Sequence, residues 1–109
     1  GRLTELPGLN STPPALSCLP SGHLVCSWGY RLPDDGSGPT AIQARVSSDQ
    51  GSTWGDTITL RHDGFDYDIG YNRQVIRPDG KVVTVYYYRT KKDGQSPTYI
   101  AATIWEPPR

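Results

Sequence analysis

An internal repeat restricts the fold of this chain more than any other feature of its sequence. Residues 15–49 align with residues 73–107 without a gap, at a constant separation of 58 positions. Eleven of the thirty-five aligned pairs are identical: Pro20/Pro78, Gly22/Gly80, Val25/Val83, Tyr30/Tyr88, Arg31/Arg89, Asp35/Asp93, Gly36/Gly94, Pro39/Pro97, Thr40/Thr98, Ile42/Ile100 and Ala44/Ala102. The chain is therefore expected to contain two copies of one supersecondary unit, stacked against each other.

Within each copy the residue pattern predicts β-strands separated by turns. Ile42, Ala44 and Val46 alternate with polar residues, which is the period of a strand with one buried face. The 12 Gly and 10 Pro residues supply the frequent turns that many short strands need. We therefore expect an all-β fold, with strands over residues 15–19, 23–30, 41–48 and 56–61 in the first copy, and 74–77, 81–88 and 99–105 in the second.

The octapeptide Ser-Ser-Asp-Gln-Gly-Ser-Thr-Trp predicts a tight turn between the third and fourth strands. It matches the pattern Ser-x-Asp-x-Gly-x-Thr-Trp at Ser47, Asp49, Gly51, Thr53 and Trp54. The Asp49 carboxylate is expected to accept hydrogen bonds from backbone N–H groups further along the turn. Gly51 can adopt the positive φ of a short hairpin loop, and Trp54 is expected to fold over the turn. These residues are expected to hold the first copy together rather than to act chemically.

Composition and charge argue against several classes of function. Eleven basic and eleven acidic residues give a net charge of zero, and no basic block occurs, so a nucleic-acid partner is not expected. No apolar run approaches the roughly 18 residues of a transmembrane helix, so no membrane partner is expected. His23 and His62 lie far apart and no CxxC motif is present, so neither a metal nor another cofactor is expected.

The two cysteines, Cys18 and Cys26, flank a Pro-Ser-Gly turn and are expected on adjacent strands of one hairpin. Both lie in apolar strand segments, which favours two buried or half-buried thiols. A disulfide between them is geometrically conceivable, and the sequence alone does not decide between the two states.

The octapeptide is similar to the Asp box, and several further segments resemble the C-terminal part of bacterial sialidase-like proteins with Asp-box (BNR) repeats. The resemblance covers nearly all of residues 13–109, and its segments are 24–31, 58–64, 68–73, 78–87 and 99–105. The family fold is a six-bladed β-propeller. Its glycosidase members are retaining exo-α-sialidases with a Tyr nucleophile, a nearby Glu, an Asp acid/base and three Arg that hold the sugar carboxylate.

This resemblance implies that each copy of the repeat is a four-stranded antiparallel propeller blade. The first blade is expected over residues 12–62 with the Asp box, and the second over 63–109 without its fourth strand. Residues 1–11 form a possible closing strand. Propellers have about four to eight blades, so the ring is completed by oligomerisation, as a homotrimer with six blades, or the chain is excised from a longer one.

The resemblance also implies a site near the start of the second blade. Tyr71 lies nine residues before Gly80, the place at which the family carries its nucleophile. The candidate catalytic residues are Tyr71 and Asp68, as nucleophile and acid/base. The candidate substrate-binding residues are Arg73, Arg31, Asp66 and Tyr88. A family Arg is expected at residues 38–40, where this chain has none, and Arg31 could take its place.

Each of these residues also has a structural interpretation. Tyr71 could line a central funnel, and the two Arg could pair with Asp66 or Asp68. Tyr88 belongs to a run of three tyrosines in which alternate rings face opposite sides of a strand, so it could be a core residue.

Three functions follow from these observations and remain open. The first is a sialidase-like, glycoside hydrolase-related protein that acts on a carbohydrate. The second is a non-catalytic, lectin-like module that binds a carbohydrate in the same place. The third is a structural fragment. The sequence does not indicate a compartment.

Overall fold

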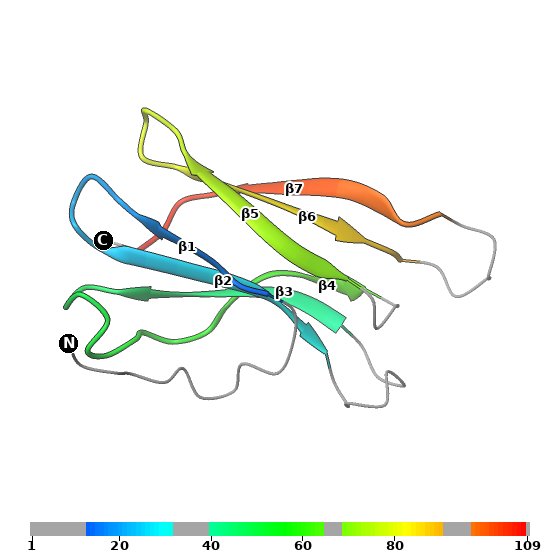
Figure 1. Ribbon diagram of the computed structural model, residues 1–109, viewed down its shortest axis with the longest axis horizontal. Helices are drawn as coiled ribbons and strands as arrows, with labels where there is room; N and C mark the ends of the chain where they lie inside the picture. The colour runs from blue at the N-terminus through cyan, green and yellow to red at the C-terminus, as the bar shows by residue number, and fades with distance from the viewer. Residues whose placement is uncertain (1–12, 32–39, 65–68, 91–96, 109) are drawn as a thin grey trace.

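The described part of the chain is built from seven β-strands and contains no helix. The computed structural model describes residues 13–31, 40–64, 69–90 and 97–108 (Figure 1). The strands are β1 (Ala15–Cys18), β2 (Leu24–Arg31), β3 (Thr40–Ser47), β4 (Ile58–Gly64), β5 (Gly70–Ile76), β6 (Val82–Tyr88) and β7 (Tyr99–Trp105). The all-β prediction and all seven expected strands are thus confirmed. β4 starts and ends later than expected, and β5 starts at Gly70, four residues before the expected start at residue 74. The candidate closing strand in residues 1–11 lies outside the described residues.

The strands form two antiparallel sheets in which each strand pairs with its neighbours in sequence. The first sheet has the order β1-β2-β3-β4 and the second the order β5-β6-β7. Only tight turns are needed to join such neighbours. β7 is the last strand in the order of the second sheet, while its counterpart β3 pairs with β4 on its other side.

The repeat seen in the sequence is present in the strand pairing. The pair Leu24↔Ser47 of β2 and β3 recurs 58 residues later as Val82↔Trp105 of β6 and β7. All four β1–β2 pairs recur in the same way between β5 and β6, ending with Ile76↔Val82.

The hairpin turns repeat in equal detail. The N–H of Gly22 donates to the carbonyl of Leu19 at 2.8 Å, and the N–H of Gly80 donates to that of Arg77 at 2.9 Å. The two glycines have φ values of 92° and 87°, a region that residues with a Cβ rarely adopt. The two copies are therefore the same structural unit from β1 to β3 and from β5 to β7.

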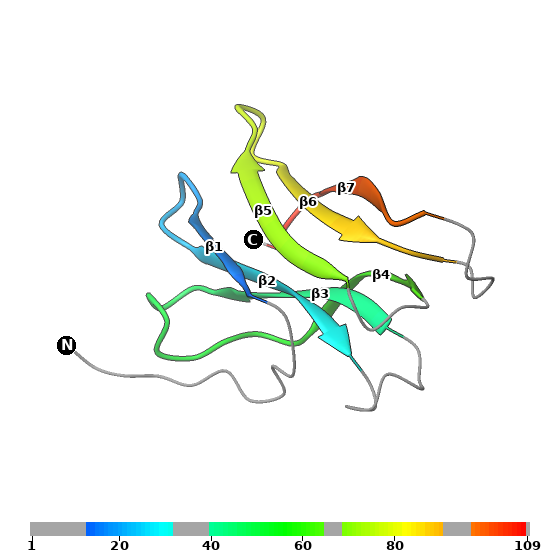
Figure 2. The same ribbon diagram turned by 45° about the vertical axis from the view of Figure 1, so that its right-hand side comes forward.

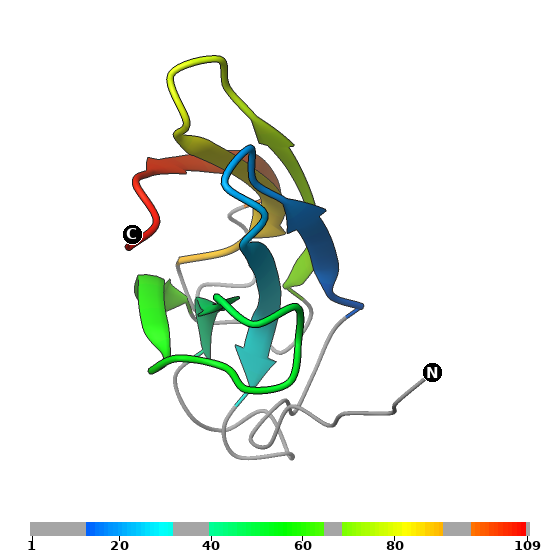
Figure 3. The same cartoon turned by 90° about the vertical axis from the view of Figure 1, so that its left-hand side faces the viewer.

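The two sheets pack against each other, one above the other in Figures 2 and 3. One buried cluster joins Ile42 of the first sheet to Tyr86 and Tyr88 of the second. A second cluster joins Val25 to Val82 near the hairpin turns. The alternating side chains of β3 and β6 produce this interface, because every second residue faces the opposite sheet.

A partly buried hydrogen-bond network crosses the same interface around Gln74 of β5. Its Nε2 donates to the Ser17 hydroxyl at 3.2 Å and to the Val25 carbonyl at 3.0 Å, both in the first sheet. Its Oε1 accepts from the Ser27 hydroxyl at 2.9 Å and from the Thr84 hydroxyl at 3.4 Å. Because each bond needs one alignment of the sheets, the network fixes how they stack.

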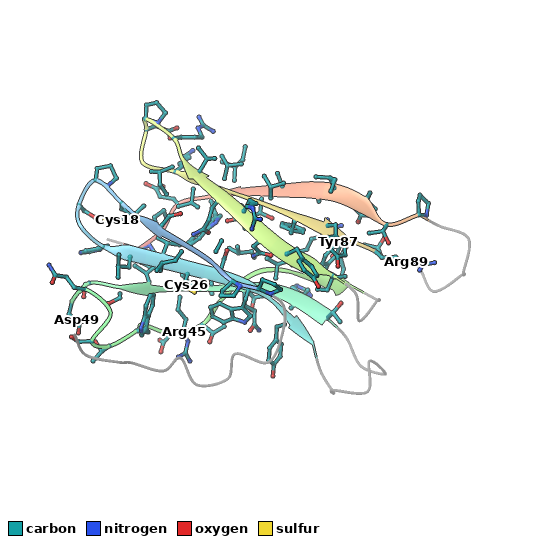
Figure 4. All side chains as sticks on the ribbon, viewed as in Figure 1. Cys18, Cys26, Arg45, Asp49, Tyr87 and Arg89 are labelled. Carbon is teal, nitrogen blue, oxygen red and sulfur yellow. The ribbon has the colours of Figure 1, made fainter. Side chains whose placement is uncertain are left out.

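The cysteines are free thiols, as favoured, but they differ in exposure (Figure 4). Cys26 is buried, and this burial raises the pKa of its thiol to about 11. Cys18 is exposed, so the expectation of burial is wrong for this residue. Its strand, β1, is the edge strand of the first sheet, and its side chain shares the outward side with Leu16, which is also exposed.

Candidate functional site

Tyr71 lies at a break in the pairing of β5 with β6. Gly70 pairs with Tyr87 and Arg73 with Val85, so Tyr71 and Asn72 together stand opposite the single residue Tyr86. Tyr71 has a φ of 51°, a left-handed conformation that costs an L-residue about 1–2 kcal/mol. This bulge turns the Tyr71 side chain to the outer face of the second sheet while Asn72 remains fully buried.

The rings of Tyr71 and Tyr87 stack on that outer face. Their centroids are 5.3 Å apart with an angle of 18° between the ring planes. Half of the Tyr71 surface is exposed. We call these two residues the aromatic platform. Stacking of this kind stabilises a ring pair by about 0.5–1.5 kcal/mol, so the platform is ordered even though it faces solvent.

Arg73 is exposed on the same face as the platform. It follows Tyr71 by two residues, and one guanidinium nitrogen donates to the Asn72 carbonyl at 3.4 Å. A guanidinium holds its donors in a planar fork that matches a carboxylate. The structure therefore brings together two predicted site residues, Tyr71 and Arg73, and adds Tyr87.

Tyr88 lies on the opposite side of the same sheet. It is fully buried between the sheets, with the Arg61 guanidinium carbon 4.3 Å from its ring centroid. Arg61 also donates to the Tyr99 hydroxyl at 2.8 Å and pairs with Asp63 at 2.7 Å. Burial raises the pKa of the Tyr88 hydroxyl above its ordinary value. Tyr88 is therefore separated from Tyr71 and Arg73 by the sheet itself.

The remaining predicted site residues are only partly placed. Arg31 is the last residue of β2, and its backbone pairs with Thr40. Its side chain lies outside the described part of the structure. Asp66 and Asp68 lie outside the described residues. The expected roles of Asp68 as acid/base and of Arg31 and Asp66 in substrate binding therefore stay predictions.

The Asp box forms the turn that leads out of β3. Ser47 donates to Asp49 Oδ1 at 2.8 Å and accepts from the N–H of Gly51 at 2.8 Å. Asp49 in turn accepts from both the N–H and the hydroxyl of Thr53. Hydrogen bonds from the Thr53 hydroxyl, the Thr53 N–H and Ser47 lower the pKa of Asp49 to about 2. Gly51 has a φ of 92°, as a short turn requires.

The Asp box and the platform lie at opposite ends of the molecule. Figure 4 labels Asp49 at the hairpin end and Tyr87 at the other end. The hairpin end also has a hollow of about 300 Å³, lined by Leu19, Pro20, Ser21, His23, Asp79, Gly80, Glu106, Pro107 and Pro108. The Asp box therefore has no direct contact with the candidate site.

Tyr87 is the site residue that the sequence did not single out. Strand alternation predicts that Tyr87 faces away from Tyr86 and Tyr88, and the burial of those two rings between the sheets agrees. What the sequence lacks is a sign of the bulge at Tyr71, which swings one ring over the other. The sequence signal for Tyr87 is that it faces outward on the strand next to Tyr71, the aromatic residue at the expected nucleophile position.

Comparisons with known proteins assign no family to this chain. No protein-family model matches the sequence, and no curated protein matches it significantly. Within the described residues no group of three His, Cys, Asp or Glu side chains is placed to hold a metal ion. The same residues include no helix of a length and hydropathy that would cross a membrane.

Proposed function

We propose that this chain binds an acidic carbohydrate with the aromatic platform and Arg73, as a sialidase-like module. The observation that carries this proposal is the half-exposed ring of Tyr71, stacked on Tyr87 beside an exposed Arg on the same face. The apolar side of a pyranose packs on a flat aromatic surface. A carboxylate on the sugar accepts two parallel hydrogen bonds from the Arg73 fork.

We further propose that the two sheets are blades of a β-propeller. Support comes from the repeated three-stranded meander with one register, and from the stacking of one copy on the other. Both features are what adjacent blades require.

Titration calorimetry with sialyllactose and with lactose tests the binding proposal. The acidic sugar binds and the neutral sugar binds more weakly. Tyr71→Ala removes binding, while Tyr71→Phe retains it because the ring face is unchanged. Arg73→Lys weakens binding of the acidic sugar about tenfold, since Lys keeps the charge but loses the fork.

Arg77→Lys is the matched control for the Arg73 variant. Arg77 is an exposed Arg next to Asp79 in the β5–β6 turn, at the opposite end of the second sheet. The proposal is wrong if Arg77→Lys weakens binding as much as Arg73→Lys, or if the native chain binds neither sugar.

A glycosidase is the second candidate function, favoured by the strained backbone and exposure of Tyr71 at the expected nucleophile position. In that case the Tyr71 oxygen attacks the anomeric carbon and gives its proton to water, while Asp68 protonates the departing glycosidic oxygen. Asp68 then deprotonates a water molecule that cleaves the bond between Tyr71 and the sugar. Arg73, Arg31 and Asp66 hold the sugar. Hydrolysis of a fluorogenic sialoside separates the candidates, because Tyr71→Phe abolishes turnover while leaving binding in place.

A further inference from the structure

The outer face of the second sheet is apolar and uncovered by any described residue. Val75 of β5 is 64% exposed, and Ile100 and Ile104 of β7 are 74% and 57% exposed. Val83 and Val85 of β6 lie between them on the same side of the sheet. Side chains of this kind on neighbouring strands form a continuous surface that favours contact with another protein surface.

The repeat shows what the equivalent surface does in the first sheet. The counterparts of Ile100 and Val83, 58 residues earlier, are Ile42 and Val25. Both are completely buried against the second sheet. In one copy of the unit this face is therefore covered by the inner face of the next copy, and in the second copy it lies open.

Two serines of the covered face correspond to valines on the open face, although Ala15 corresponds to Arg73 at its edge. Ser17 and Ser27, which hydrogen-bond to Gln74 inside the chain, are replaced by Val75 and Val85 on the open face. A polar residue such as Gln74 would find no partners there.

The surface that corresponds to the inner face of the second sheet is the outer face of the first sheet. On that surface the counterpart of Gln74 is Leu16, and the counterpart of Ile76 is Cys18. Leu16 is 64% exposed and Cys18 is exposed. The contact that the repeat predicts is therefore apolar on both sides, with Leu16 on the first sheet and Val75 and Val85 on the second.

We propose that the outer face of the second sheet docks onto the β1 side of the first sheet of another copy of this chain. The contact repeats the stacking inside the chain, with Leu16 of one copy in place of Gln74, against Val75 and Val85 of the other. The two docking faces are different, so the association is head-to-tail and a pair of copies keeps one free face of each kind at its two ends.

The docking begins along β1 because that part of the first sheet is open. Cys26 and Trp28 on the same side are already buried within the chain. Tyr71 and Tyr87 lie at the Ile100 end of the docking face, because Tyr87 pairs with Ile100. Docking and sugar binding therefore compete for the platform. Self-association is measured without a sugar, so its failure and the failure of the proposed carbohydrate site are separate results.

Light scattering of the full chain over a range of concentrations tests the proposal. The native chain has a mass above that of one chain, and a mass of three chains is the closed ring expected for six blades. Leu16→Asp and Ile100→Asp each give the mass of one chain. An equimolar mixture of these two variants recovers the mass of two chains, because one intact face of each kind remains.

Gln50→Asp, in the exposed Asp-box turn, is the control for an added charge and associates as the native chain does. Circular dichroism establishes that the Asp variants are folded, as expected for substitutions at exposed positions. A native chain that keeps the mass of one chain at every concentration overturns the proposal. So does a Leu16→Asp variant that associates normally, since that result requires like faces to pair.

Discussion

Strands β1–β3 of the first sheet and β5–β7 of the second pair in the same register, but their equivalent faces differ in burial. In the first sheet the side that carries Ile42 is buried, and in the second the equivalent side, with Ile100, faces solvent. The strand sequences are similar, and Ile42 and Ile100 are identical. The difference arises only from whether another sheet lies on top. A strand pattern therefore tells which residues share a face, while stacking decides whether that face is a core.

The first and largest test of this comparison removes the same side chain from both sheets. Ile42→Ala lowers the free energy of unfolding by about 3 kcal/mol, because it leaves a cavity between the sheets. Ile100→Ala changes it by less than about 0.5 kcal/mol at concentrations where the chain does not associate. Urea unfolding monitored by tyrosine and tryptophan fluorescence measures both. Equal losses would mean that the two faces are covered alike.

Replacing the polar centre of the interface tests how the sheets select each other. Gln74→Leu lowers the free energy of unfolding by about 2 kcal/mol, because Ser17, Ser27 and the Val25 carbonyl lose a buried partner. Leu16→Gln is the reciprocal change at the equivalent exposed position, and it leaves the free energy of unfolding of the single chain unchanged. Urea unfolding of both variants provides the comparison. A fully stable Gln74→Leu protein would contradict the role of this network.

A smaller effect is expected at the two equivalent turns. Gly22→Ala and Gly80→Ala each lower the free energy of unfolding by about 1 kcal/mol, because both turns need a positive φ. An added Cβ meets no atom within 4 Å at either position, so the cost is confined to the backbone. Thermal and urea unfolding of the single and double variants should give equal and additive losses. A loss at only one turn would show that the copies differ there.

The Asp box is found in the first sheet alone, and acid titration isolates its contribution. The pKa of Asp49 is lowered to about 2 from an ordinary value of 3.8. Its ionised form therefore stabilises the native state fully above about pH 4, and this stabilisation disappears as the pH falls through 2. The difference in unfolding free energy between native protein and Asp49→Asn is constant near neutral pH and narrows below pH 4. This effect is the smallest, because the carboxylate faces water.

The strands and their faces could be predicted from the sequence because they follow from local chemistry. Alternation in β3 and β6 identifies the buried side, and the Gly in each hairpin marks its turn. The 58-residue offset relates the two copies, and equivalent residues pair in the same way in both.

The candidate site could be predicted only in part. The sequence indicates Tyr71 and Arg73, but their placement beside Tyr87 depends on the bulge between Gly70 and Arg73. At this bulge Asn72 is buried between the sheets and donates to the Ser27 hydroxyl, a contact between residues 45 positions apart. The role of Gln74 is likewise invisible in sequence, because its partners in the first sheet lie 47 to 59 residues away along the chain.

The position of β7 at the end of the second sheet has a consequence for aggregation. An edge strand offers unpaired N–H and C=O groups to which a foreign strand can add, and apolar edge strands are frequent starting points of fibrils. Prolines bracket β7 at Pro97 and Pro107, and a proline has no N–H to donate. At this edge, addition of a foreign strand is therefore confined to the seven residues of β7, while growth by stacking of faces is left open.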